Sequence, residues 1–137
     1  MYRFLDHPSE ALIEVTAPTV EGVFRDSAVA LFETMTDTSK VKPEKVFDVP
    51  LQAQNREDLL IDWLNSLILI QETKKVFLSQ FEITIHQGPK WRLQASVKGS
   101  SIEKGHERRS EVKSATYGQF FWEESPEGHR VQFVLDV

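Results

Sequence analysis

The chain has 137 residues, a formal net charge of −5 and no cysteine. The absence of cysteine excludes disulfides, thiolate catalysis and cysteine zinc sites. The negative balance argues against nucleic acid as a direct high-affinity ligand, because binding phosphates requires a clustered basic surface. The length is typical of one domain, so we expect a single domain over residues 1–137. No apolar run is long enough to span a membrane and the first residues do not resemble a secretory signal, so we expect a cytoplasmic protein without a membrane partner.

The first quarter of the chain predicts two short strands followed by a helix. Apolar residues indicate strands over residues 4–7 and 11–15, which Pro8 separates. Thr19 is a suitable N-cap for the helix, because its hydroxyl can accept a hydrogen bond from the first helical turn. One apolar stripe then recurs at three- and four-residue spacing, and it consists of Val20, Phe24, Ala28, Leu31, Phe32 and Met35. The polar run 36–39 ends this helix.

An edge strand and a second helix follow. Alternating apolar residues over 47–53 predict a strand, and Pro50 within it indicates a sheet edge, because proline cannot donate a ladder hydrogen bond. Asn55 is the expected N-cap of the next helix, and Asp58 follows three residues later. The buried stripe of this helix is expected to contain Leu60, Trp63, Leu64, Leu67 and Ile68.

The second half of the chain changes to the two-residue period of β-strands. We expect two antiparallel pairs joined by turns, at residues 81–85 with 91–97 and 112–122 with 130–136. A polar loop over 99–109 separates the two pairs. Two helices, antiparallel strands and no regular strand–helix alternation predict an α+β fold, in which the two helices pack on a largely antiparallel, mixed β-sheet.

The last strand ends in two carboxylates. Alternation over residues 131–136 predicts a strand with one buried face, which would hold the Asp136 side chain and the Val137 carboxylate within a few ångströms of each other. Two unit charges about 4 Å apart repel by roughly 4 kcal/mol at an effective dielectric of 20. We therefore expect a lysine, an arginine or a metal ion beside them. A frayed end with both charges solvated is the alternative.

Histidines, glycines and serines indicate no separate catalytic site. The chain lacks a glycine-rich phosphate loop and a Gly-x-Ser-x-Gly elbow. Its histidines show none of the spacings of a zinc site, and they are His7, His86, His106 and His129. The aromatic residues Trp63, Trp91 and 120–122 are expected in the core, although three consecutive aromatic residues on a strand point to both faces and can expose an apolar patch to a partner.

Three short segments carry a more specific signal when they are taken together. They are Asp-His-Pro-Ser-Glu at 6–10, Glu-Val-Lys-Ser-Ala-Thr-Tyr at 111–117 and Leu-Asp-Val at 135–137. In this order, in a chain of this length, they resemble the archease family. Residues 32–37 and 59–65 are similar to parts of the family's two helices, so the resemblance covers essentially the whole chain.

The resemblance implies a non-catalytic role in tRNA splicing. Archeases are small accessory proteins of the RNA ligase that joins 2′,3′-cyclic phosphate or 3′-phosphate ends to 5′-hydroxyl ends. They promote GTP-dependent guanylylation of the ligase's active-site histidine and allow multiple turnover. The expected partner is therefore the RNA-splicing ligase, which binds the GTP itself, and this chain is expected to be an activator rather than an enzyme.

The resemblance also implies a divalent-metal site. An archease builds it from the last acid of the N-terminal signature, the penultimate aspartate and the C-terminal residue, which here are Glu10, Asp136 and Val137. Lys113 matches the motif lysine that is implicated in activating the ligase. The three ligands are hard oxygens, which suit calcium, or magnesium or manganese. We expect a structural role for Asp6, since an extended chain would carry it too far from Glu10 to share an ion.

The chain departs from the family pattern at three places. Glu10 stands where aspartate is usual, so ligation requires the backbone or the ion to shift. Pro8 and Ser9 replace threonine and alanine, and Gly118 stands where histidine is common.

Two other functions stay open at this point. One is a chaperone-like protein-interaction module, which would need a broad exposed apolar surface. The other is a metal-dependent hydrolase, in which Glu10 and Asp136 hold a metal ion and Lys113 stabilises developing charge.

Overall fold

The computed structural model describes residues 1–5 and 10–137. Its elements in chain order are β1 (Tyr2–Leu5), β2 (Ala11–Ala17), α1 (Val20–Met35), a 3-10 turn η1 (Thr38–Lys40), β3 (Lys45–Ala53), α2 (Arg56–Lys74), β4 (Val76–Gln87), β5 (Trp91–Ser101), β6 (Ser114–Ser125) and β7 (Gly128–Asp136). The expected first strand lies only partly within the described residues, because 6–9 fall outside them.

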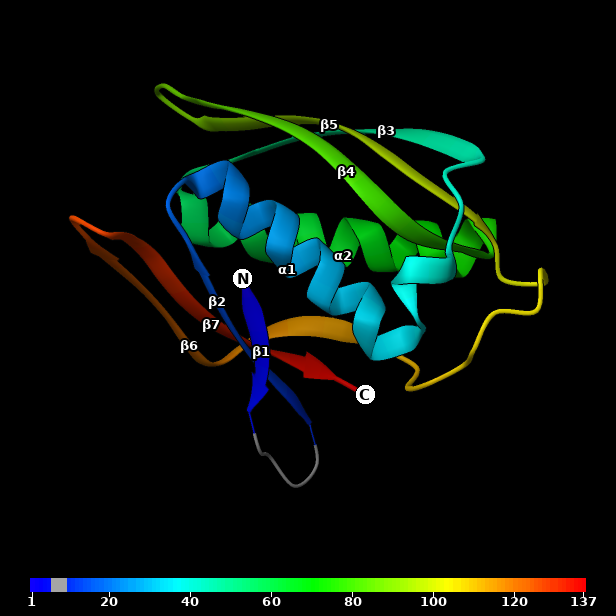
Figure 1. Ribbon diagram of the computed structural model, residues 1–137. Helices are drawn as coiled ribbons and strands as arrows, with labels where there is room; N and C mark the ends of the chain where they lie inside the picture. The colour runs from blue at the N-terminus through cyan, green and yellow to red at the C-terminus, as the bar shows by residue number, and fades with distance from the viewer. Residues whose placement is uncertain (6–9) are drawn as a thin grey trace.

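The strands form two antiparallel sheets with both helices between them (Figure 1). The four-stranded sheet has the order β1-β2-β7-β6, and the three-stranded sheet has the order β3-β5-β4. α1 contacts β2 and β4, and α2 contacts β6 and β3, so each helix touches both sheets. The predicted α+β class is confirmed. The structure adds that the strands are divided between two sheets and that every described pair is antiparallel.

The helix starts lie where their capping residues predicted them. The Thr19 hydroxyl accepts a hydrogen bond from the Gly22 N–H at 3.0 Å, and the Asn55 side chain accepts one from the Asp58 N–H at 2.8 Å. Each bond satisfies an N–H group that has no partner within the first helical turn. α1 ends at Met35, immediately before the polar run that was expected to stop it.

Trp63 connects the two helices with each other and with the three-stranded sheet. Its side chain is fully buried, and its ring lies edge-on to Phe81 of β4 with centroids 6.2 Å apart. Its Nε1–H donates to the Phe24 carbonyl of α1 at 3.0 Å, so the one polar atom of the indole is satisfied. Side chains from both helices and both sheets belong to the same hydrophobic cluster.

The strand predictions hold for both hairpins. β3 is an edge strand, as Pro50 indicated. β4 pairs with β5 and β6 pairs with β7, and the first pair extends further than the alternation suggested. The aromatic residues at 120–122 are only partly buried. Within the described residues, no helix is both long and apolar enough to cross a membrane.

Candidate functional site

The candidate site lies at one end of the four-stranded sheet, where β2 begins and β7 ends (Figure 1). The antiparallel register pairs Ala11 with Leu135. Glu10 precedes Ala11 and Asp136 follows Leu135, so the same register places these two acids opposite each other, one residue beyond the last pair. On its other side, Asp136 pairs with Ser114 of β6. Acids from opposite ends of the sequence therefore meet at one edge.

Lys113 lies beside these acids. Its main-chain N–H donates to the Asp136 carbonyl at 2.8 Å, directly before β6 begins. Val112 is 1% exposed and anchors this segment in the core, whereas the Lys113 side chain is on the surface. Lys113 is thus the cationic residue whose backbone lies next to the expected pair of carboxylates. We call Glu10, Asp136, Val137 and Lys113 the β2–β7 site.

The segment that leads into the site lysine is fixed to the C-terminal end of α1. The N–H groups of Arg109 and Ser110 donate to two carbonyls in the last turn of that helix, at 2.8 and 3.0 Å. The Arg109 Nη1 also lies 2.9 Å from the Glu33 carboxylate. Burial raises the pKa of Glu33, but hydrogen bonds from Thr38 and Arg109 outweigh it and hold the pKa below its ordinary value. This ionised pair therefore helps to fix the chain segment that precedes Lys113.

The charges of the β2–β7 site are uncompensated within the described part of the chain. None of Glu10, Asp136 and Lys113 has an ion-pair partner among those residues. Asp136 and Lys113 are exposed, Glu10 is partly buried and Val137 is 37% exposed. Neighbouring carboxylates repel each other, so a cation bound there would be favourable.

The donor set fits a hard cation but is small. Carboxylate oxygens are the ligands that calcium, magnesium and manganese prefer. Across residues 1–5 and 10–137, no group of three His, Cys, Asp or Glu side chains is arranged to hold a metal ion. The expected set has two such side chains, Glu10 and Asp136, and a main-chain carboxylate from Val137. Asp6 and His7 lie outside the described residues.

Comparison with known proteins settles the family. Residues 2–137 match the model of the Archease protein family (MTH1598/TM1083). The chain belongs to the archease family. Protein archease of Methanothermobacter thermautotrophicus is 35% identical over 117 residues, which cover 85% of this chain and 84% of the relative. Protein archease of Sulfurisphaera tokodaii is 30% identical over 137 residues, covering 99% of this chain and 98% of the relative.

Solved structures agree with this archease assignment. The solution structure of Methanobacterium thermoautotrophicum protein 1598 is similar with a TM-score of 0.88 and 31% identity, covering 99% of this chain and 98% of that one. The crystal structure of an archease from Thermotoga maritima has a TM-score of 0.67 at 17% identity, covering 100% of this chain and 98% of that one, and it supports the fold alone. The resemblance inferred from three short segments is confirmed.

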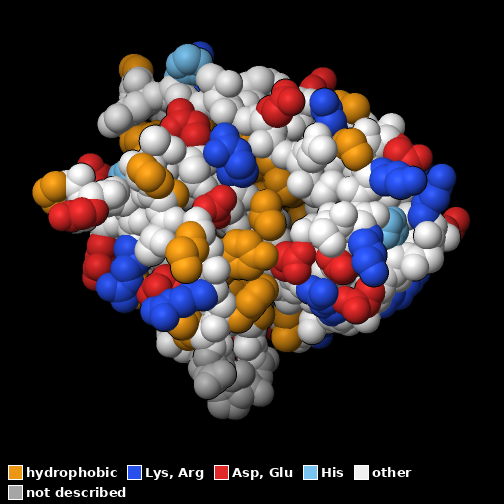
Figure 2. Space-filling view, viewed as in Figure 1, with side chains coloured by type: hydrophobic (Ala, Val, Ile, Leu, Met, Phe, Trp, Pro, Cys, Tyr) orange, Lys and Arg blue, Asp and Glu red, His pale blue; other side chains and the backbone are white. Residues whose placement is uncertain are grey.

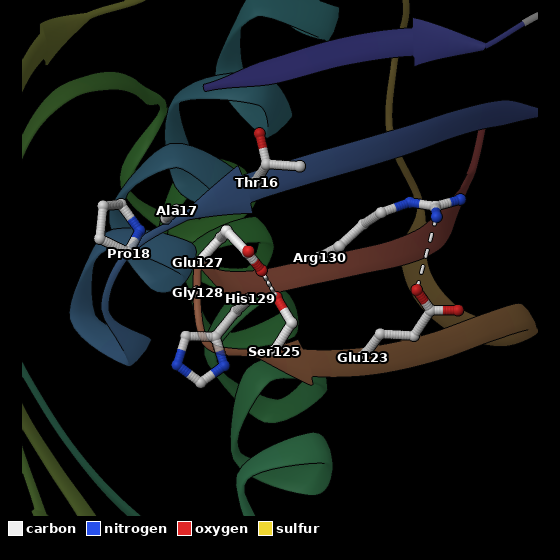
Figure 3. A pocket seen from close by; sticks show the side chains of 9 residues that line it. All are labelled: Thr16, Ala17, Pro18, Glu123, Ser125, Glu127, Gly128, His129 and Arg130. Carbon is white, nitrogen blue, oxygen red and sulfur yellow. Dashed lines mark hydrogen bonds and ion pairs between the residues drawn. The ribbon is translucent and has the colours of Figure 1, made fainter.

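A cavity at the other end of the same archease sheet is separate from the site. It has a volume of about 370 Å³ and is lined by Thr16, Ala17, Pro18, Glu123, Ser125, Glu127, Gly128, His129 and Arg130. Figure 3 shows Arg130 and Glu123 facing each other across neighbouring strands, with the His129 ring pointing away from them. Along β7, Asp136 lies seven positions after His129, roughly 23 Å of extended chain. The cavity therefore takes no part in the β2–β7 site.

Glu14 holds together the outer face of the sheet that carries the site. Its side chain is 8% exposed and lies 2.8 Å from Arg3 Nε and 3.0 Å from Arg130 Nε, so one carboxylate links β1, β2 and β7. The hydrogen bond from Arg3 outweighs the effect of burial and, together with Arg130, holds the pKa of Glu14 below its ordinary value.

We expect Glu14→Gln to lower the free energy of unfolding at neutral pH by about 1–2 kcal/mol, because charge-assisted hydrogen bonds are lost. A lowered folded-state pKa means that this contribution is present above the unfolded-state pKa, about 4.3, and is lost as the pH falls through the folded value. Urea unfolding at about pH 7 and about pH 3 should show the difference from wild type shrinking on acidification.

Glu82→Gln is the matched control. Glu82 is exposed on the three-stranded sheet and lies 4.0 Å from Lys98, and such surface pairs contribute little. Equal losses in the two variants, or a Glu14→Gln effect that does not change with pH, would contradict the assigned role.

β6 becomes irregular directly after the site. The pairing register shifts after Thr116, and Gln119 has a φ of 55°, in the left-handed region that non-glycine residues rarely adopt. Within this bulge the Tyr117 hydroxyl donates to the Asp58 carboxylate of α2. The pKa of Tyr117 is raised, mainly by partial burial and secondly by this hydrogen bond. A Cβ at Gly118 would make its nearest contact at 3.5 Å, so the backbone here has room for the first atom of a side chain.

Sequence reasoning missed one residue that fixes the site strand to a helix. The side chain of Asn65 on α2 hydrogen-bonds both main-chain groups of Ala115 on β6. A helical asparagine is ordinarily a surface residue. Two signals were available: its place between Leu64 and Leu67 of the buried stripe, and its position at the end of the family-like segment 59–65.

Proposed function

We propose that this archease assists the RNA ligase of tRNA splicing, which joins 3′-phosphate or 2′,3′-cyclic phosphate ends to 5′-hydroxyl ends. It would promote GTP-dependent guanylylation of the ligase without being a catalyst itself. The observation that supports this proposal is the convergence at one sheet end of the residues that the archease pattern assigns to metal binding and activation, Glu10, Asp136, Val137 and Lys113. The ligase would bind the RNA and the GTP.

In this proposal the acids of the β2–β7 site hold a divalent cation. Glu10, Asp136 and the Val137 carboxylate would provide hard oxygen ligands for calcium, magnesium or manganese. The bound cation would supply positive charge for phosphate or carboxylate groups of the partner. The exposed Lys113 side chain is free to extend toward the same partner. Direct RNA binding by this chain is disfavoured by its net charge of −5.

We expect Lys113→Ala to slow ligase guanylylation by about tenfold, the loss of roughly 1.4 kcal/mol of transition-state stabilisation. Metal affinity should stay within about twofold of wild type, because Lys113 contributes no oxygen ligand. The rate is measured as transfer of labelled GMP from GTP to the ligase, and the affinity by calorimetric titration with calcium or manganese.

Lys42→Ala is the control for the lysine, because Lys42 is also exposed but lies in the segment between η1 and β3. If adding the wild-type protein leaves the rate of ligase guanylylation unchanged at every metal concentration, the proposal is wrong. Metal-dependent cleavage of a phosphodiester in the absence of ligase would instead favour the hydrolase.

A second function, that of a chaperone-like module, has one structural observation in its favour. Figure 2 shows hydrophobic side chains gathered in a band on the face where α1 and β1 lie in front. On β1, Phe4 is 50% exposed and its ring contacts Tyr2. The Thermotoga maritima relative is described as a possible chaperone. Suppression of client aggregation that is reduced by Phe4→Ser and unaffected by Asp136→Ala would support this function over ligase activation.

A further inference from the structure

Asn65 pairs with the strand that enters the β2–β7 site. The Ala115 N–H donates to Asn65 Oδ1 at 2.8 Å, and the Asn65 Nδ2 donates to the Ala115 carbonyl at 3.2 Å. Ala115 is 5% exposed, so both of its main-chain groups are shielded from water. One carboxamide thus satisfies the donor and the acceptor of a buried residue, as an adjacent strand would do.

This pairing matters because β6 is an outer strand. Its only described strand neighbour is β7, and on its other side alternate residues turn their N–H and C=O groups outward. The ladder between β6 and β7 is also short at this end. Only Ser114, Ala115 and Thr116 pair before the register shifts, so the bulge separates these three pairs from the rest of the hairpin. Asn65 therefore holds a short segment that its own sheet holds weakly.

The short segment contains the contacts that place the site residues. Ser114, adjacent to Ala115, pairs with Asp136, and Lys113 donates its main-chain N–H to the Asp136 carbonyl. A displacement of Ala115 therefore reaches both Asp136 and Lys113 through one residue, Ser114. No other side chain of α2 is hydrogen-bonded to residues 113–116 within the described structure.

We propose that Asn65 is a positioning residue for the β2–β7 site, which sets the placement of Asp136 and Lys113 through Ala115. The inference deepens the proposed ligase-activating function and rests on it for its effect on activity. Its structural part, the coupling of Asn65 to Lys113, is independent of that function.

The test compares Asn65→Ala with Asn65→Asp. Removing the carboxamide should raise the dissociation constant for manganese about tenfold and slow ligase guanylylation about tenfold, the lower end of the effect of losing a direct partner of a metal ligand, because Asn65 acts on Asp136 only through Ala115 and Ser114. In Asn65→Asp, the carboxylate is ionised at neutral pH, so it can still accept from the Ala115 N–H but cannot donate to the Ala115 carbonyl. This variant should therefore hold Ala115 more loosely than wild type but more tightly than Asn65→Ala, and its Lys113 amide should exchange at an intermediate rate at about pH 7.

Amide hydrogen exchange separates positioning from simple stabilisation. We expect the Lys113 amide, and not only that of Ala115, to exchange at least about tenfold faster in Asn65→Ala, with amides at the centre of β2 and β7 unchanged. Ser79→Ala is the matched control, because it removes a side-chain hydrogen bond to the Val41 carbonyl beside the three-stranded sheet. That variant should leave the Lys113 amide and the manganese affinity unchanged.

The outcomes decide the two ideas separately. An unchanged Lys113 exchange rate in Asn65→Ala, or a rate in Asn65→Asp equal to that of wild type, overturns the positioning role. Faster Lys113 exchange with a wild-type protein that does not stimulate the ligase supports the positioning role and rejects the proposed function. If Asn65→Ala does not fold, Asn65→Asp, which keeps one of the two hydrogen bonds to Ala115, is compared with wild type instead.

Discussion

Asp136→Ala is expected to weaken divalent-cation binding by roughly 100-fold, or about 3 kcal/mol, because truncating one partner of a close charged contact typically costs 2–5 kcal/mol. Glu10 and the Val137 carboxylate would remain, too few to retain a hard cation tightly. Activation of the ligase should fall in parallel. Calorimetric titration with calcium and manganese, followed by the guanylylation assay at saturating metal, measures both effects.

The stability of the fold should not change in Asp136→Ala. The Asp136 side chain is exposed and has no ion-pair partner in the described chain, and its strand is held by main-chain pairing with β2 and β6. Asp48→Ala is the matched control, since Asp48 is an exposed acid on β3 of the other sheet. We expect both variants to unfold at the temperature of wild type, and only Asp136→Ala to lose metal affinity. Equal affinities in the two variants would contradict the assignment of Asp136 as a ligand.

Gly99→Ala is expected to cost about 3 kcal/mol of unfolding free energy, at the upper end for overpacking a core. Gly99 lies in β5 opposite Leu78 of the neighbouring strand β4, next to a register shift where the two backbones come close together. A Cβ there would lie 1.8 Å from the Phe77 carbonyl oxygen and 2.8 Å from the Leu78 Cα. Both contacts are with backbone, so no rotamer change relieves them, and the two strands must separate.

Gly88→Ala gives the comparison within the same hairpin. A Cβ on Gly88, in the turn between β4 and β5, would make its nearest contact at 3.7 Å. Urea unfolding should show a change of less than about 0.5 kcal/mol, as for most surface substitutions. Similar losses at Gly99 and Gly88 would mean that the close approach of β4 does not carry the effect.

Local sequence signals were sufficient for the elements of this fold. Thr19 and Asn55 mark helix starts because their side chains accept hydrogen bonds from the first turn, and Pro50 marks an edge because it lacks a donor. Such signals act within a few residues. They do not report which strands become neighbours, so the division into two sheets around the helices was not predicted.

The candidate site shows the same limit more sharply. Alternation over β7 indicates which side chains share a face, yet it cannot indicate that Glu10 is the residue opposite Asp136, because a partner strand and its register are set by the whole fold. The acids and Lys113 were named through the family pattern. No sequence pattern predicts the bulge that follows Thr116 or the pairing of Asn65 with Ala115, since both depend on contacts between distant segments.

Anomalous scattering from a manganese-soaked crystal tests most directly whether the two ends of the sequence hold a cation together. The account predicts one peak at about 2.0–2.6 Å from oxygens of Glu10, Asp136 and Val137, absent in Asp136→Ala. Glu10 oxygens lying more than roughly 10 Å from those of Asp136 and Val137, a separation that no single ion bridges, or a manganese peak elsewhere on the protein, would contradict it.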